Sequence, residues 1–275
     1  MNIYTNGNVL YVDAAGGGDY TTVQAAIDAA QAQTPTFAQP WAILVRPGTY
    51  PEDLTFYPFV NVLGWPGGSG PHLVTLQAAT VTGHTFTPAA GNHTLLLADL
   101  ELDQPNASSP VLTQSGTGHL YGFRLTTAGG FSFSNTAVTL TESTLVGNGI
   151  APGDFVITAG PTTDLTLKRC VLEHDHSGIS TDVDGLLDVD DCQINTGGTT
   201  SISTKSEETF ITFSEVAGPI LANDGGGGVP ADLAVGINYS KVNAVTVDGN
   251  AVPGVASLNI GVSVHGALSV VNGAV

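Results

Sequence analysis

Apolar and polar residues alternate in short segments that recur along the chain from about residue 94. The core residues Leu140, Leu167, Val189, Phe213 and Val235, one from each of five segments, are separated by 27, 22, 24 and 22 residues. A near-constant period of this size indicates stacked repeats, because one repeat alone cannot bury its own apolar face. Glycine-rich segments such as TTAGG, NTGG and NDGGGG predict the turns between them.

The repeats have the character of β-strands. Val, Ile, Leu, Thr and Phe alternate within them, and they lack both a helical pattern and the spaced leucines of a leucine-rich repeat. The pattern therefore predicts an all-β fold, a single-stranded parallel β-helix in which each repeat forms one coil of a solenoid. We expect the β-helix to be right-handed, because parallel crossover connections are right-handed.

One short helix precedes the strands. An apolar stripe predicts an α-helix over about residues 21–33, which caps the open N-terminal end of the stack. Thr21 and Gln24 have the spacing of a capping box, and Pro35 ends the helical segment. The residues of the stripe are Val23, Ala26, Ile27 and Ala30.

We expect a single domain with three regions: an N-terminal cap over residues 1–50, coils over about 51–248, and a C-terminal segment over 249–275. No acidic or basic residue follows Asp248. An uncharged, strand-patterned end of this kind predicts either the last coil or a contact between subunits. The residues of the predicted oligomer contact, which share one face, are Leu258, Ile260, Val262 and Val264.

Two cysteines support the period. Cys170 and Cys192 are 22 residues apart, at equivalent places in the segments LKRC and VDDC. Neighbouring parallel strands lie about 4.8 Å apart, which is within the range of a disulfide. We expect two reduced thiols stacked in an inward-facing ladder, because a free cysteine behaves as a small buried hydrophobic residue.

Charge narrows the class of partners. The chain has 24 acidic and six basic residues, a net charge of −18, so its field repels nucleic acid and opposes acidic polysaccharides unless cations bridge the two. No run of 18 apolar residues occurs, so no membrane span is predicted. The start MNIYTNGNVLYVDA lacks the basic and apolar regions of a signal peptide, which predicts synthesis in a cytoplasm.

The N-terminal residues carry a family resemblance. The segment GGGDYTTVQAAIDAA, followed by ILVRPGTYPEDLTF, resembles the cap and first coil of the pectin lyase-like superfamily, most closely pectin methylesterases and phage tailspike-type proteins. The resemblance covers residues 11 to about 64, and beyond them only the coil period is shared. It implies a right-handed β-helix, and either polysaccharide chemistry or a role in a virus particle.

The catalytic segments of these enzymes are incomplete in this chain. Asp154-Phe155 resembles the start of the methylesterase nucleophile segment, but the glutamine-rich segments are absent, so we interpret Asp154 as a turn residue. Asp190 and Asp191 resemble the Asp pair of polygalacturonases, and His174 resembles their histidine, but the histidine here precedes the pair. On a regular strand Asp190 would point inward with Cys192 unless a turn intervenes. These four residues are therefore weak catalytic candidates.

A run of acidic residues could bind a metal. Carboxylates are ligands for Ca²⁺, and His174 and His176, two residues apart on a strand, could together bind a softer ion. The spacing matches no known calcium loop, so the alternative is a solvated acidic turn. No other cofactor is predicted. The weak calcium candidates are Asp175, Asp182, Asp184 and Asp188.

Three function classes follow from these observations. The first is a non-enzymatic structural protein of a virus particle, either a capsid decoration, a spike or a tail component, which assembles as a homotrimer with other virion proteins. The mean hydropathy of +0.20 favours apolar surface shared between subunits. The second is a tailspike-like protein that binds or depolymerises a surface glycan. The third is a pectin methylesterase-like carbohydrate esterase.

Overall fold

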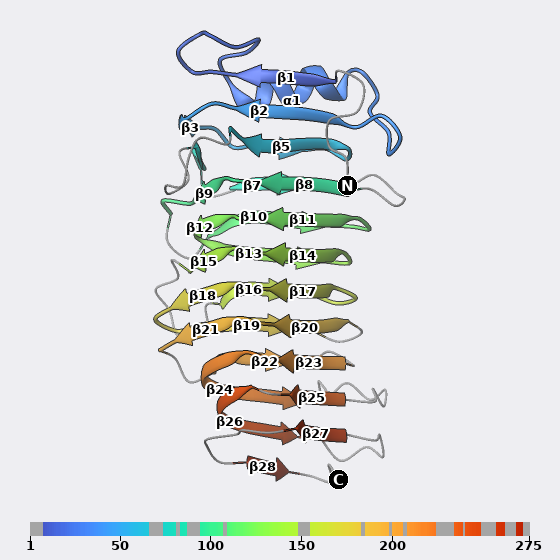
Figure 1. Cartoon of the computed structure of the whole chain (residues 1–275), viewed down its shortest axis with the longest axis vertical. Helices are drawn as coiled ribbons and strands as arrows, with labels where there is room; N and C mark the ends of the chain where they lie inside the picture. Colours follow the sequence, from blue (N-terminus) through green and yellow to red (C-terminus); the bar gives the residue numbers. More distant parts are fainter. Residues whose placement is uncertain are drawn as a thin grey trace.

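The computed structural model describes residues 8–65, 74–80, 83–86, 94–106, 109–147, 155–182, 185–197, 200–205, 208–223, 234–238, 240–248, 257–261 and 268–271. These residues form an all-β stack of parallel strands with one short helix at its N-terminal end (Figure 1). The all-β class and the long parallel sheets are therefore confirmed, and they are consistent with a solenoid. In the described part of the chain, no helix has the length and apolar character required to cross a membrane.

Each coil contributes strands to three columns. Column 1 is an 11-stranded parallel sheet. Every strand of it pairs with the strand one coil away, so the sheet runs along the whole stack (Figure 1). Its strands are β1 (Val9–Val12), β2 (Trp41–Val45), β5 (Val60–Gly64), β8 (Thr94–Ala98), β11 (His119–Phe123), β14 (Ala137–Thr141), β17 (Asp164–Lys168), β20 (Leu186–Asp190), β23 (Glu208–Thr212), β25 (Ala234–Asn238) and β27 (Ser257–Gly261).

Columns 2 and 3 belong to one sheet, because two long strands run through both: β24 (Glu215–Asn223) and β26 (Lys241–Asp248). The other strands of column 2 are β3 (Gly48–Pro51), β6 (Val74–Gln77), β9 (Glu101–Asp103), β12 (Thr126–Ala128), β15 (Thr144–Val146), β18 (Val171–His174) and β21 (Gln193–Thr196). Those of column 3 are β4 (Thr55–Phe56), β7 (His84–Phe86), β10 (Pro110–Ser115), β13 (Gly130–Ser134), β16 (Phe155–Ala159), β19 (Ser177–Thr181), β22 (Ile202–Thr204) and β28 (Leu268–Val271).

The register of column 1 corrects part of the predicted repeat. Leu140, Leu167 and Val189 stack on one another as expected, but the next partners are Ile211 and Ile237. Phe213 instead lies after β23 with φ 49° and is 60% exposed, and Val235 pairs with Thr209. The predicted register failed at β23 because the inner position next to Ile211 is occupied by a buried threonine, Thr209. The two phenylalanines of this segment, Phe210 and Phe213, face outward instead.

A left-handed residue marks the turn between columns 1 and 2, which we call the first corner. One residue after the column 1 strand, the backbone has φ between 48° and 57° in six coils. Because this residue and the one before it both point outward, the next residue turns inward. The left-handed residues are Asp99, Arg124, Glu142, Arg169, Asp191 and Phe213, and those that follow them and point inward are Leu100, Leu125, Ser143, Cys170, Cys192 and Ser214.

The helix α1 (Val23–Gln31) lies within the predicted range, and all four residues of its apolar stripe are buried. The predicted capping box is wrong, because the N-cap residue is Thr22 and its side chain makes no capping bond. The carboxylate of Glu52 accepts the first helical N–H groups instead, from Val23 at 2.8 Å and from Gln24 at 3.0 Å. The side chain of Gln24 is directed elsewhere, since its oxygen accepts a bond from the N–H of Thr55.

The C-terminal contact stays a prediction, as does the division into three regions. Leu258 and Ile260 lie on β27, where their backbone pairs with Val235 and Ile237. Val262 and Val264 lie outside the described residues.

Candidate functional site

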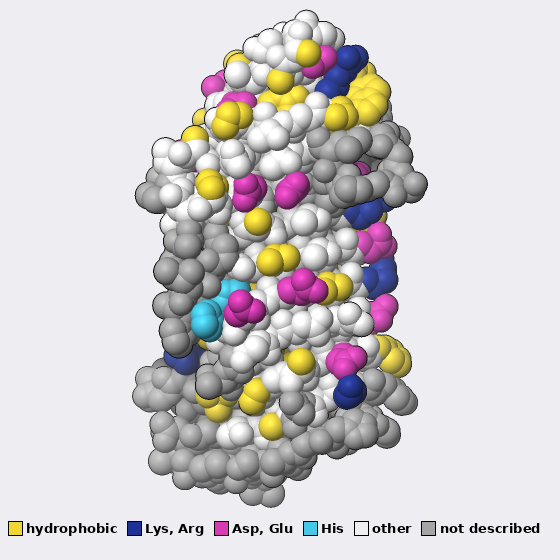
Figure 2. Space-filling model, turned by 90° about the vertical axis from the view of Figure 1, so that its left-hand side faces the viewer, with side chains coloured by type: hydrophobic (Ala, Val, Ile, Leu, Met, Phe, Trp, Pro, Cys, Tyr) yellow, Lys and Arg dark blue, Asp and Glu magenta, His cyan; other side chains and the backbone are white. Residues whose placement is uncertain are grey.

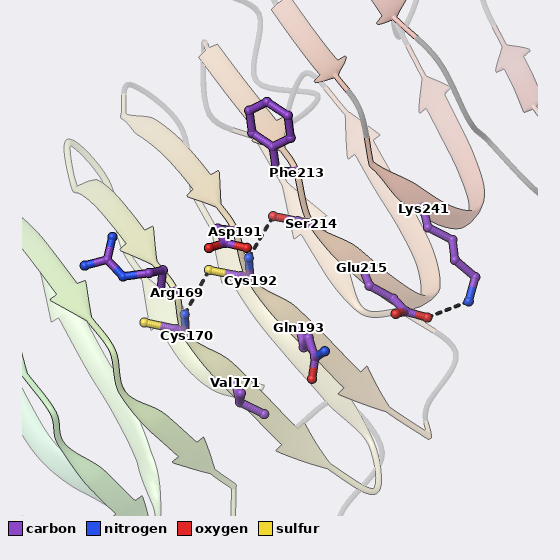
Figure 3. A pocket seen from close by; sticks show the side chains of 10 residues that line it. All are labelled: Arg169, Cys170, Val171, Asp191, Cys192, Gln193, Phe213, Ser214, Glu215 and Lys241. Atoms are coloured by element: carbon purple, nitrogen blue, oxygen red, sulfur yellow. Dashed lines mark hydrogen bonds and ion pairs between the residues drawn. The ribbon is translucent and has the colours of Figure 1, made fainter.

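A groove of about 560 Å³ crosses the first corner over neighbouring coils. Its floor is formed where β17, β20 and β23 lead into β18, β21 and β24 (Figure 3). This volume lies within the range of roughly 300–1,000 Å³ that is typical of small-ligand sites. The residues that line it are Arg169, Cys170, Val171, Asp191, Cys192, Gln193, Phe213, Ser214, Glu215 and Lys241.

The inner wall of the groove is a ladder of hydrogen bonds between coils. The N–H of Cys170 donates to Sγ of Cys192 at 3.3 Å, and the N–H of Cys192 donates to Oγ of Ser214 at 3.1 Å (Figure 3). The ladder continues at both ends, from Leu125 to Ser143 and from Ser214 to Ser240. These side chains supply the acceptor that each corner N–H requires, because a buried N–H without a partner is costly.

The two cysteines are free, buried and stacked, as predicted. Each thiol also lies near a carbonyl two residues earlier in the chain, that of Lys168 or of Asp190. The hydrogen bond from the Cys192 thiol lowers the pKa of Cys170, whereas the hydrogen bond to Cys170 together with burial raises the pKa of Cys192. Of the two thiols, that of Cys170 is therefore the more readily ionised.

Charged and aromatic side chains form the rim. Nη2 of Arg169 lies 2.8 Å from Oε1 of Glu142, and Nζ of Lys241 lies 2.6 Å from Oε1 of Glu215. Phe213 extends away from the wall and is 60% exposed (Figure 3). The rim thus presents one exposed aromatic ring beside positively and negatively charged side chains.

The structure does not bring the weak catalytic candidates together. Asp190 ends β20 and Asp191 follows at the first corner, where φ is 51°. The intervening turn makes both aspartates face outward while Cys192 faces inward, so Asp190 does not share the direction of Cys192 as it would on a regular strand. His174 lies at the far end of β18, away from this corner. Asp154 lies outside the described residues.

The acidic residues proposed for calcium are also dispersed. Asp175 follows β18, Asp182 follows β19 in column 3, and Asp188 lies on β20 in column 1; Asp184 lies outside the described residues. Burial raises the pKa of Asp188, and the nearby Lys168 opposes that shift. Over the part of the chain that the structure describes, no group of three His, Cys, Asp or Glu side chains is arranged to hold an ion.

The two histidines proposed for a softer ion contact each other directly. Nδ1 of His174 accepts the backbone N–H of His176 at 3.0 Å, and the two rings pack edge to face with centroids 5.4 Å apart. His174 is buried, and its ring packs so closely on Gly147 that any side chain there would collide with it. Their pairing therefore has a local structural role.

The ion pairs along the first corner were not identified from the sequence. Nε and Nη2 of Arg124 bind the carboxylate of Asp99 at 2.6 and 2.7 Å, and Arg169 repeats this pairing with Glu142. Figure 2 shows acidic and basic side chains alternating along the edge where this corner lies. The sequence does contain a recurring pattern, a charged residue directly before Leu, Ser or Cys in successive repeats. This pattern predicts ion pairs only once it is known that the charged residue occupies a left-handed turn and faces outward.

Comparison with known proteins gives no further indication of function. No family model and no curated protein matches the sequence.

Proposed function

We propose that this chain is a non-enzymatic structural protein of a virus particle, a capsid decoration, spike or tail component, built as a right-handed, single-stranded parallel β-helix that assembles as a homotrimer. The observation that carries the proposal is the double reinforcement of the first corner. Ion pairs join neighbouring coils outside the corner, and a ladder of Ser and Cys side chains joins them inside.

This reinforcement supports a mechanical role. Arg124, Arg169 and Lys241, three of the six basic residues, pair with an acidic residue of an adjacent coil. Exposed pairs contribute little singly, but these three each link one coil to its neighbour along the same side of the stack. Directional bonds on both sides of one corner resist shear between coils, which is what a shaft or surface ornament requires.

The test is physical association with particles. An antibody raised against the purified chain should label intact virus particles propagated from the source of the sequence, and the chain should sediment with them at a fixed ratio to the major capsid protein. Detergent washing distinguishes a built-in component from an adsorbed one. A chain found only in the soluble fraction would contradict the proposal.

A second candidate, glycan binding, is favoured by the groove. An exposed ring beside hydrogen-bonding groups is a platform on which sugars pack, and Phe213 with Gln193 and Asp191 provides both. Calorimetric titration with oligosaccharides should then detect binding that Phe213→Ala abolishes. The matched control is Phe210→Ala, which removes a ring that is 39% exposed on the outer face of β23, outside the groove lining.

Depolymerisation of a glycan, or its de-esterification, is distinguished from binding by product analysis. Release of reducing ends would indicate a hydrolase, and release of methanol from a methyl-esterified polymer would indicate an esterase. Either product, lost in the Asp190→Asn variant, would contradict the non-enzymatic proposal.

A further inference from the structure

An unbroken row of hydroxyl groups runs along the outer face of column 3. In seven successive coils the outward residue at one register position is serine or threonine, and each is the register partner of the next. The strands concerned lie one above another in Figure 1. The residues of this hydroxyl row are Thr55, Thr85, Thr113, Ser132, Thr158, Ser180 and Ser203.

The hydroxyl row is accessible to a partner. Thr158 is exposed and the other six side chains are half-buried. Among the seven hydroxyl groups of the row, only that of Thr113 makes a hydrogen bond within the described part of the chain. It donates to the carbonyl of His84 at 3.5 Å. The spacing is that of parallel strands, about 4.8 Å, so the row is about 29 Å long. Ser115 and Ser134, which pair with each other, widen the face at two coils.

The chemistry of the row is self-complementary. A hydroxyl both donates and accepts a hydrogen bond, so a row of hydroxyls can bond to an identical row. A row of carboxylates or ammonium groups cannot do this. A contact in which the same surface of each copy meets requires a surface that complements itself, and the hydroxyl row meets this condition.

Charge singles out the same face. The chain carries −18, so two copies repel each other wherever their carboxylates face. The outer face of column 2 includes Glu101, Glu173 and Glu215, whereas the hydroxyl row has no charged member. At its edges, Asp53 precedes β4, while Asp182 and Lys205 follow β19 and β22, which gives two negative charges and one positive charge.

We propose that the hydroxyl row is the surface by which copies of this chain pack, with the rows of parallel copies meeting in register along the three-fold axis of the homotrimer. The proposal rests on the assembly part of the proposed function, and it assigns the contact to column 3 instead of the C-terminal segment.

Cysteine cross-linking tests the contact directly. Ser132→Cys and Ser180→Cys should each give a disulfide between identical residues of two copies after mild oxidation, since parallel copies in register place each residue of the row at the same height as its equivalent. Thr126→Cys is the matched control, because Thr126 faces outward from column 2 in the same coil as Ser132. Cross-linking no faster at Ser132 than at Thr126 would overturn the proposal.

Light scattering provides the second measurement. The purified chain should be oligomeric over a concentration series, and Ser132→Glu with Ser180→Glu should shift it to monomer, while Thr126→Glu leaves the mass unchanged. Each variant is outward-facing, and its circular dichroism and melting transition verify folding. A native chain that is monomeric throughout, or an oligomer that survives the double variant, overturns the proposal.

The outcomes separate this proposal from the virion role. An oligomer that labels particles but survives the double variant rejects only the hydroxyl row. Row-dependent oligomers that never associate with particles reject only the virion role. A monomer that a neutral polysaccharide column retains, and that Ser132→Glu releases, replaces the second copy with a glycan as the occupant of the row.

Discussion

At the scale of single residues, the structure assigns roles to side chains that hydropathy does not distinguish. His84 is fully buried on β7, where Nδ1 accepts the N–H of Leu54 at 3.2 Å and Nε2 lies 3.1 Å from the carbonyl of Leu76. The ring must be neutral to accept at one nitrogen and donate at the other. Burial lowers the pKa of His84, and Asp53 and Asp103 only partly oppose this.

His84 therefore makes stability depend on pH. The pKa of His84 lies near 6.5 in the unfolded chain and lower in the folded one. Its contribution to the free energy of unfolding is therefore complete above pH 6.5 and decreases as the pH falls below that value. The free energy of unfolding, measured by urea denaturation, should fall by up to about 1.4 kcal/mol per pH unit from this group. His84→Gln should be less stable at neutral pH but have a smaller slope below 6.5. An unchanged slope would contradict this role.

The corner cysteines are expected to act as acceptors rather than as a redox pair. Cys192→Ser retains an acceptor for the N–H of Cys170, whereas Cys192→Ala has nearly the same size and lacks one. Leaving a buried N–H without a partner costs about 1–3 kcal/mol. We expect the alanine variant to be less stable than the serine variant by that amount in urea denaturation. Equal stabilities would show that the thiol only fills space.

At the scale of the secondary-structure element, residues distant in the sequence supply contacts that the local sequence lacks. The helix α1 has the predicted stripe, but its N-terminal N–H groups are capped by Glu52, 29 residues after Val23. A carboxylate at this place satisfies two N–H groups and interacts favourably with the helix dipole. The N-terminal end of the stack is thus held by hydrogen bonds between the helix and the chain just after β3.

Replacing this cap should loosen the N-terminal end. Glu52→Gln should reduce the free energy of unfolding by about 1 kcal/mol and increase amide exchange in α1. Thr22→Ala, at the N-cap position whose side chain makes no capping bond, is the control and should have little effect. A larger loss from Thr22→Ala than from Glu52→Gln would mean that the capping assignment is incorrect.

At the scale of the whole molecule, the net negative charge opposes assembly, and the uncharged face of column 3 is where copies are expected to make contact. A chain with a net charge of −18 repels its copies over a distance that salt shortens, from about 30 Å at 0.01 M to about 8 Å at physiological ionic strength. The uncharged hydroxyl row is a line along which close approach costs least. Assembly through it should therefore respond to ionic strength in a defined direction.

Raising the salt concentration should increase the average mass measured by light scattering at constant protein concentration, because screening reduces the repulsion between copies. The Ser132→Glu and Ser180→Glu double variant should need more salt than the native chain to reach the same mass. A mass that decreases with salt would indicate a contact held by ion pairs instead of hydroxyl groups.

How much could be predicted depended on the distance between interacting residues. The period, the strands, the helical stripe and the stacking of Cys170 on Cys192 followed from local pattern and spacing. The register failed at Phe213, because hydropathy alone gave preference to a phenylalanine over the buried Thr209. The sequence-based candidates for catalysis and metal binding gave no site, since the described members lie on different columns and corners.

The amino-acid sequence by itself determined the class of structure, because alternation and a repeat of constant length depend on residues close together in the chain. Only the tertiary structure decided which residues share a surface. A left-handed residue at the first corner of six coils changes which side chains turn inward, and partners such as Arg124 and Asp99 are brought together by stacking of coils. The charged corner, the groove and the hydroxyl row exist because residues one coil apart lie about 4.8 Å from each other.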